Sequence, residues 1–204
     1  LQRFAGNEPI LEAKKISKSF ASNRLVLNQI SFHVNRGEIF GILGPNGSGK
    51  TTLFNLILGI LPMDSGKITI NGEIINSLPI HVRCKNYKIS YVPQNSACLL
   101  GLKVEENLEA ISEIKIKDKI KRKENVQELL ARFGLENIKH TKASLLSGGE
   151  RRRLSISMAL VTKPNILLLD EPFSALDPLS VEMIRKIISD LQLQSGISSI
   201  ITDH

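Results

Sequence analysis

The chain has 204 residues, of which 42% are hydrophobic and 4% aromatic, and its formal net charge is +7. This length and composition predict one globular domain with a substantial core and exclude a largely disordered chain. No apolar run approaches the roughly 20 residues that span a bilayer, and the basic balance suits nucleic acid, an anionic membrane surface or a phosphorylated ligand equally well.

The N-terminal part predicts an antiparallel sheet. The segments expected as strands here are 10–17, 25–35 and 67–70. Short turns rather than helices join them, which favours antiparallel pairing. We expect one turn at 18–23, which includes Phe20, another at 64–66, and a hairpin turn at Asn71-Gly72.

A glycine-rich loop separates a short apolar segment at 38–43, expected as a buried strand, from a predicted helix at 52–59. The loop reads Gly44-Pro45-Asn46-Gly47-Ser48-Gly49-Lys50-Thr51, the phosphate-binding pattern G-x-x-x-x-G-K-[ST]. Its glycines let backbone N–H groups face phosphate oxygens, and the helix N-terminus adds a positive dipole end. Lys50 would hold the β- and γ-phosphates and the Thr51 hydroxyl would bind Mg²⁺, so the loop predicts a nucleoside triphosphate site.

A strand at 89–92 is expected next, and from about Val104 the pattern becomes helical. We predict one helix over 115–132, ended by Gly134, inside a helical lobe at roughly 99–142. The basic run at 115–123 predicts a solvated helix face, with attraction to an anionic membrane leaflet as the alternative.

The C-terminal part alternates helices and strands. The expected helices run from Ser147 to about Thr162 and over 180–194, and the expected strands are 165–170 and 198–203. This alternation predicts an α/β fold: a P-loop NTPase core with a mainly parallel sheet, an N-terminal antiparallel β subdomain and an inserted α-helical subdomain.

Two short motifs in this part carry chemistry. Asp170 and Glu171 end an apolar strand, the edge at which open α/β sheets bind ligands. Asp170 would hold Mg²⁺ directly or through water, and Glu171 would polarise an attacking water. Ser147-Gly148-Gly149-Glu150 predicts a capping box on a helix whose N-terminus the glycines leave bare, a second anion site.

Leu146-Ser147-Gly148-Gly149-Glu150 also resembles the signature motif of ATP-binding-cassette (ABC) ATPases, and the other motifs follow in that family's order. The resemblance implies that Glu171 and the switch histidine His204 are catalytic, and that Phe20 stacks on adenine. The ATP-contacting residues it implies are Phe20, Gly44, Pro45, Asn46, Gly47, Ser48, Gly49, Lys50, Thr51, Thr52, Gln94, Ser147, Gly148, Gly149, Glu150, Asp170 and Asp177, with Thr51, Gln94 and Asp170 as metal ligands.

The same resemblance implies ATP and Mg²⁺ as cofactors and a second copy of the chain as partner. Two cassettes would pair head to tail in a homodimer, with each ATP between the P-loop of one copy and the signature of the other. Closure on ATP would drive transmembrane permease subunits, and no nucleic acid is expected as a partner. This places the chain in the cytoplasm, peripheral on the cytoplasmic face of the inner membrane, which agrees with reading Cys84 and Cys98 as free thiols.

Segments 146–154 and 170–181 are most similar to ATPases that power lipopolysaccharide export in Gram-negative bacteria. Segment 95–102 departs from that pattern because it lacks a Phe-Arg pair associated with partner docking. Such ATPases continue past the switch histidine, so we expect a C-terminally truncated chain. Importers of branched-chain amino acids are the main alternative, followed by soluble ABC proteins that act on nucleic acid or ribosomes. The signature motif disfavours a P-loop kinase or GTPase.

Overall fold

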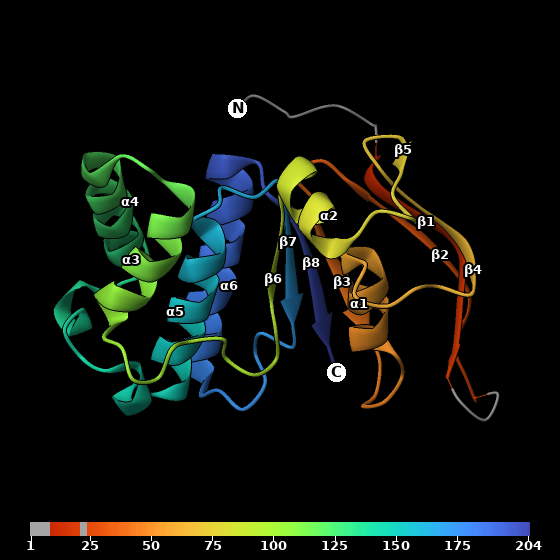
Figure 1. The fold of residues 1–204 in the computed structure, drawn as a ribbon. Helices are drawn as coiled ribbons and strands as arrows, with labels where there is room; N and C mark the ends of the chain where they lie inside the picture. The colour runs from red at the N-terminus through yellow and green to blue at the C-terminus, as the bar shows by residue number, and fades with distance from the viewer. Residues whose placement is uncertain (1–8, 21–23) are drawn as a thin grey trace.

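The computed structural model describes residues 9–20 and 24–204, which form two sheets and a set of packed helices (Figure 1). The strands are β1 (Pro9–Phe20), β2 (Arg24–Asn35), β3 (Ile39–Leu43), β4 (Ser65–Ile70), β5 (Glu73–Ile74), β6 (Ile89–Val92), β7 (Ile166–Asp170) and β8 (Ser198–Asp203). The α-helices are α1 (Lys50–Leu58), α2 (Ile80–Asn86), α3 (Val104–Lys115), α4 (Lys119–Arg132), α5 (Gly148–Leu160) and α6 (Pro178–Ser195). Two short 3₁₀ helices, η1 (Glu136–Ile138) and η2 (Ala143–Leu145), connect α4 to α5.

The N-terminal sheet is antiparallel throughout, in the order β2-β1-β4-β5, as predicted. Asn71 and Gly72 both have positive φ angles, 51° and 80°, which suits a two-residue hairpin turn between β4 and β5. Two predicted turns are wrong in part, because β1 continues through Phe20 and β4 already begins at Ser65. The remainder of the first turn, 21–23, lies outside the described residues.

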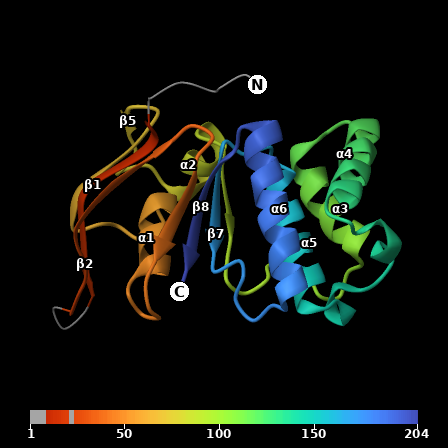
Figure 2. The same ribbon diagram turned by 180° about the vertical axis from the view of Figure 1, so that it is seen from behind.

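The second sheet is parallel, in the order β3-β8-β7-β6, and helices cover both of its faces (Figures 1 and 2). Side chains of β7 alternate between two cores: Leu167 and Leu169 pack with α5 and α6, whereas Ile166 and Leu168 pack with α1 and the antiparallel sheet. All five residues of β7 are therefore buried, which confirms the interpretation of its apolar run.

The expectation that the strand before the P-loop is buried is wrong. In the described part of the chain β3 has β8 as its single strand partner, so it forms an edge of the sheet. Ile39 is 40% exposed and Leu43 is 75% exposed because they point away from both cores. The parallel pairing with β8 nevertheless fixes the position at which the P-loop begins.

The predicted helix over 115–132 is two helices. α3 ends at Lys115 and α4 begins at Lys119, because the Asp118 side chain accepts hydrogen bonds from the backbone N–H groups of Ile120 and Lys121 and caps α4. Ile120, in the first turn of α4, is exposed. α2 was not predicted, since its sequence carries no apolar periodicity. No helix in the described residues is both long enough and apolar enough to cross a membrane.

Candidate nucleotide-binding site

The P-loop joins β3 to α1 at the carboxyl edge of the parallel sheet. Gly49 has a φ of 99° and lies directly before α1, and a side chain there would come within 2.9 Å of Val26 and Leu27 of β2. Glycine is therefore required for both the backbone angle and the packing. A cavity of about 290 Å³ opens over the loop and is lined by Val26, Gly47, Gly49, Lys50, Thr51, Thr52 and Glu171.

Lys50 is a buried cation inside this loop. Its ammonium group donates to the carbonyl oxygens of Gly44 at 2.5 Å and Pro45 at 3.2 Å, and lies 3.5 Å from Glu171 Oε1. A buried lysine is unusual unless it is paired, and here one carboxylate and two carbonyls balance it. Its ammonium thus lies at the wall of the cavity, where phosphate oxygens can replace the carbonyls.

Glu171 is the point at which the predicted site residues meet. Its Oε2 accepts a hydrogen bond from Gln94 Nε2 at 2.6 Å and lies 3.1 Å from His204 Nε2, while its Oε1 faces Lys50. The residue is buried and has a φ of 45°, a conformation uncommon for a side-chain-bearing residue. Three residues from different parts of the sequence are thus brought together around the Glu171 carboxylate.

Asp170, one residue earlier, accepts hydrogen bonds from three hydroxyl groups. Thr51 Oγ1 and Tyr91 OH donate to Oδ2 at 2.8 and 3.1 Å, and Thr202 Oγ1 donates to Oδ1 at 2.6 Å. The Thr202 hydroxyl also accepts from the Glu171 N–H at 2.9 Å. Oxygen donors of this kind fit Mg²⁺, so Thr51 and Asp170 fit the predicted metal role, whereas the Gln94 amide nitrogen is directed at Glu171.

Tyr91 and Thr202 were missed by the sequence analysis. They lie at the carboxyl ends of β6 and β8, the two neighbours of β7, and Thr202 pairs directly with Asp170 in the sheet register. The signal that could have found them is the strand order, because neighbouring parallel strands end at the same edge.

Arg152 of α5 is a third residue that was missed. Its guanidinium donates to the carbonyl oxygens of Pro93 at 2.9 Å and Gln94 at 2.7 Å. Burial lowers the pKa of Arg152, although the nearby Asp170 carboxylate opposes this shift. Arg152 therefore links α5, which begins within the signature motif, to the backbone of Gln94, the residue that contacts Glu171.

The signature motif forms the predicted capping box. The Glu150 N–H donates to Ser147 Oγ at 3.3 Å, and the Ser147 N–H donates to Glu150 Oε2 at 2.8 Å. The helix N-terminus is not bare on the side of α6, however, because a side chain at Gly149 would overlap the Ser180 hydroxyl and approach its Cβ within 2.8 Å. Gly149 is small because the start of α6 packs against it.

Asp177 caps that neighbouring helix. Its carboxylate accepts from Ser180 Oγ at 2.5 Å and from the Ser180 N–H at 2.9 Å, and these hydrogen bonds lower the pKa of Asp177. Asp177 and the signature therefore belong to one packed unit at the N-termini of α5 and α6.

The signature and Phe20 do not line the P-loop cavity. α5 packs on the face of the parallel sheet opposite α1, as Figure 2 shows, so the two predicted anion sites of one chain face different sides. Phe20 is 42% exposed at the end of β1, with the Lys18 ammonium 5.7 Å from its ring centre. The structure thus brings the P-loop and Thr52 together with Gln94, Asp170, Glu171 and His204. It leaves Phe20, the signature residues and Asp177 apart from this group.

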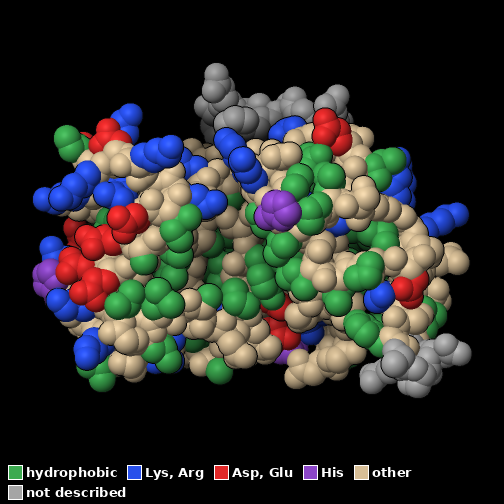
Figure 3. Space-filling view, in the orientation of Figure 1, with side chains coloured by type: hydrophobic (Ala, Val, Ile, Leu, Met, Phe, Trp, Pro, Cys, Tyr) green, Lys and Arg blue, Asp and Glu red, His purple; other side chains and the backbone are tan. Residues whose placement is uncertain are grey.

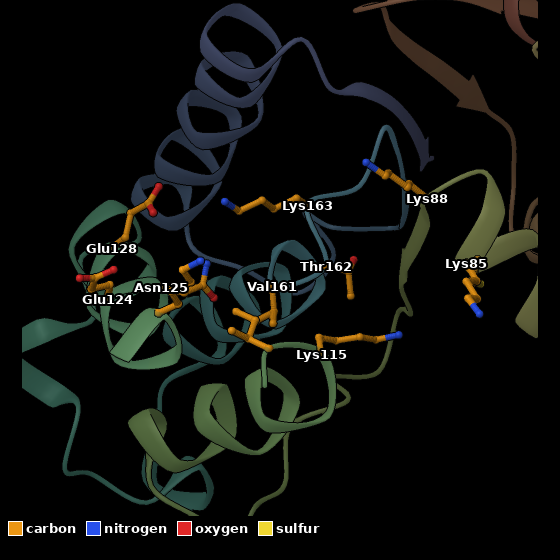
Figure 4. Close-up of a pocket in the computed structure, with 12 residues that line it drawn as sticks. Lys85, Lys88, Lys115, Glu124, Asn125, Glu128, Val161, Thr162 and Lys163 are labelled. Atoms are coloured by element: carbon orange, nitrogen blue, oxygen red, sulfur yellow. The ribbon is translucent and has the colours of Figure 1, made fainter. Parts of the chain in front are cut away.

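A larger cavity, of about 690 Å³, lies at the amino ends of β6 and β7 (Figure 4). Its lining includes Lys85 and Lys115, which lie in the last turns of α2 and α3 and complement the negative ends of those helices, and Lys163, which follows α5. Lysines of the basic run at 115–123 are exposed where α3 ends and α4 begins, at the upper left of Figure 3, as a solvated face requires. Attraction to an anionic membrane leaflet stays a prediction.

Comparison with known proteins agrees with these motifs. The family model described as ABC transporter matches residues 27–174. The chain is 46% identical, over 96% of its length and 80% of the relative, to the lipopolysaccharide export system ATP-binding protein LptB of Haemophilus influenzae.

Solved structures with the same fold include cbiO1 of Clostridium perfringens, part of the ABC transporter complex cbiONQ. It has a TM-score of 0.87 and 30% identity, and the match covers 97% of this chain and 79% of that one. The ATP-binding cassette MJ0796, in a dimeric post-hydrolysis state bound to ADP and Pi, has a TM-score of 0.83 and 27% identity, with coverage of 95% and 88%.

Proposed function

The chain belongs to the ABC transporter family as an ATP-binding and ATP-hydrolysing subunit, and we propose that it powers the export of lipopolysaccharide from the inner membrane. The observation that carries the ATPase chemistry is the meeting of Lys50, Gln94 and His204 at Glu171. The similarity to LptB supports lipopolysaccharide as the substrate. An importer of branched-chain amino acids is the second candidate, since such ATPases share much of the signature region.

In the proposed hydrolysis, the P-loop N–H groups and the Lys50 ammonium bind the β- and γ-phosphates, and Glu171 takes a proton from the attacking water. Gln94 and His204 hold the Glu171 carboxylate through Oε2, and Lys50 faces its other oxygen. Thr51 and Asp170 would hold Mg²⁺, which neutralises developing phosphate charge when bound. Gln94 is proposed as a further ligand and Phe20 as the surface that stacks on adenine.

We propose that the signature residues contact the ATP that is bound at the P-loop of a second copy of the chain. Within one chain, α1 and α5 lie on opposite faces of the sheet, so Ser147 to Glu150 and Asp177 have no route to their own P-loop cavity. Head-to-tail pairing of two chains would bring each signature to the partner's phosphates, and the dimeric form of MJ0796 supports such pairing.

The proposed partners are transmembrane permeases reached from the cytoplasmic face of the inner membrane. The helical subdomain, roughly 99–142, and the segment after Gln94 would contact them. Leu99 and Leu100 are exposed in that segment, which lacks the Phe-Arg pair expected there. An apolar contact would therefore replace the aromatic and cationic one.

The experiment that tests the substrate is recovery of the membrane proteins that co-purify with the full-length chain in mild detergent. Two paired permeases with a periplasmic lipid-handling subunit would support lipopolysaccharide export. Recovery of permeases with a periplasmic amino-acid-binding protein would instead support import of amino acids and contradict lipopolysaccharide export. Recovery of nucleic acid or ribosomes alone would contradict a role in transport.

A further inference from the structure

Tyr91 lies between the P-loop helix and the two acidic residues. It belongs to β6, and its phenol donates a hydrogen bond to Asp170 Oδ2 at 3.1 Å. Its ring meets Phe54 of α1 edge to face, with centroids 6.1 Å apart and planes at 84°. One side chain therefore connects the helix that carries Lys50 to the carboxylate at the end of β7.

Hydrogen bonds occupy most of the acceptor positions of the Asp170 carboxylate. A carboxylate offers about four acceptor positions. Among the described residues, Thr51 and Tyr91 use those on Oδ2, and Thr202 uses one on Oδ1. One acceptor position on Oδ1 is left, which can serve a metal ion or a metal-bound water.

The three hydroxyl groups that donate to Asp170 differ in their other contacts. Thr51 belongs to the P-loop and is itself a proposed metal ligand, so its oxygen must serve the ion as well. Tyr91 and Thr202 are on the strands that flank β7 and have no other proposed contact with the nucleotide. The orientation of the Asp170 carboxylate is therefore set by the neighbouring strands.

The strand that carries Tyr91 also serves the second acidic residue of the site. The same strand leads to Gln94, three residues on, which donates to Glu171. The end of β6 thus orients both acidic residues of the site.

We infer that Tyr91 is a positioning residue for Mg²⁺, which fixes the Asp170 carboxylate so that its remaining acceptor position is available to the ion. The inference rests on the proposed nucleotide site. It assigns to Tyr91 a role in metal affinity and none in contact with ATP.

The test replaces Tyr91 by phenylalanine, which keeps the ring and its contact with Phe54 and removes the hydroxyl. The matched control is Tyr87→Phe, because Tyr87 is the other tyrosine of the chain and its hydroxyl donates to Glu73 at 2.7 Å, away from the P-loop. Binding of a fluorescent ATP analogue is titrated with Mg²⁺ and repeated in EDTA, and thermal unfolding is recorded for each protein.

We expect Tyr91→Phe to raise the Mg²⁺ concentration for half-maximal enhancement of binding about tenfold, as loss of a group that orients a metal ligand does. Binding in EDTA should equal that of the wild type, and Tyr87→Phe should keep the wild-type Mg²⁺ dependence. An unchanged Mg²⁺ midpoint in Tyr91→Phe would overturn the inference, as would an equal loss of binding with and without Mg²⁺. Wild-type protein that shows no binding of the analogue would overturn the nucleotide site itself.

Discussion

At the scale of single residues, the site depends on one carboxylate held from three directions. Glu171 is contacted by Lys50 on one oxygen and by Gln94 and His204 on the other. Each contact comes from a different segment, so the side chain has little freedom to turn. Glu171 held in this way can take a proton from water only if its carboxylate keeps its negative charge. Removal of that charge by substitution therefore tests its role as the base.

Glu171→Gln keeps the shape of the side chain and removes its negative charge. We expect ATP hydrolysis to fall by roughly 10²- to 10⁴-fold, the usual contribution of a general base, while ATP binding is retained. Phosphate release and binding of a fluorescent ATP analogue would be measured on the same protein. Glu128→Gln, an exposed change on α4, is the control and should leave hydrolysis unchanged. Normal hydrolysis by Glu171→Gln would rule out Glu171 as the base.

At the scale of elements, α5 and α6 are joined at their N-termini by glycine packing. Ser180, in the first turn of α6, is held by Asp177 through both its N–H and its hydroxyl. If the residue at position 149 of α5 becomes larger, Ser180 can move away only by breaking these hydrogen bonds. The small residues of the signature serve this contact within the chain, besides any role toward a second copy.

Gly149→Ala should consequently destabilise the fold. The new methyl group would overlap the Ser180 hydroxyl and lie 2.8 Å from its Cβ, so we expect a cost of about 1–3 kcal/mol in the free energy of unfolding. Gly148→Ala is the matched control, because a methyl there meets the flexible end of Leu176 at 3.2 Å and the Ala175 carbonyl oxygen at an ordinary contact distance of 3.9 Å. Denaturant unfolding of both variants would measure the difference.

A second pair of variants tests the cause of that cost. If Ser180 is responsible, adding Gly149→Ala to a Ser180→Gly protein should cost much less than adding it to the wild type. Equal costs in the two backgrounds would show that the destabilisation arises from the helix itself.

How much of this could be predicted depends on whether a feature is local. The P-loop, the capping box of α5 and the buried run of β7 were predicted because neighbouring residues specify them. The contacts of Tyr91, Thr202 and Arg152 depend on strand order and helix packing, which no local pattern encodes. The break between α3 and α4 depends on one capping side chain, Asp118, within a strongly helical pattern.

At the scale of the whole molecule, the parallel sheet separates the two groups of residues that are proposed to bind ATP, the P-loop and the signature. The P-loop cavity opens beside α1, whereas the signature begins α5 on the opposite face (Figures 1 and 2). A single chain can bind ATP by its P-loop but cannot enclose it. If the signature residues bind phosphate, the ATP-bound form must contain at least two chains.

Glu171→Gln protein with Mg²⁺ and ATP should therefore form a stable dimer, because ATP joins the chains and is not removed by hydrolysis. Light scattering after size-exclusion chromatography should give twice the chain mass of 22.6 kDa with ATP and a single chain mass without it. Adding Lys50→Ala to the same protein should abolish the dimer through loss of ATP binding. Adding Ser147→Ala should weaken the dimer and leave binding at the P-loop intact, since Ser147 lies on the opposite face. A dimer that forms without ATP, or one that is indifferent to both additions, would contradict enclosure of ATP between two chains.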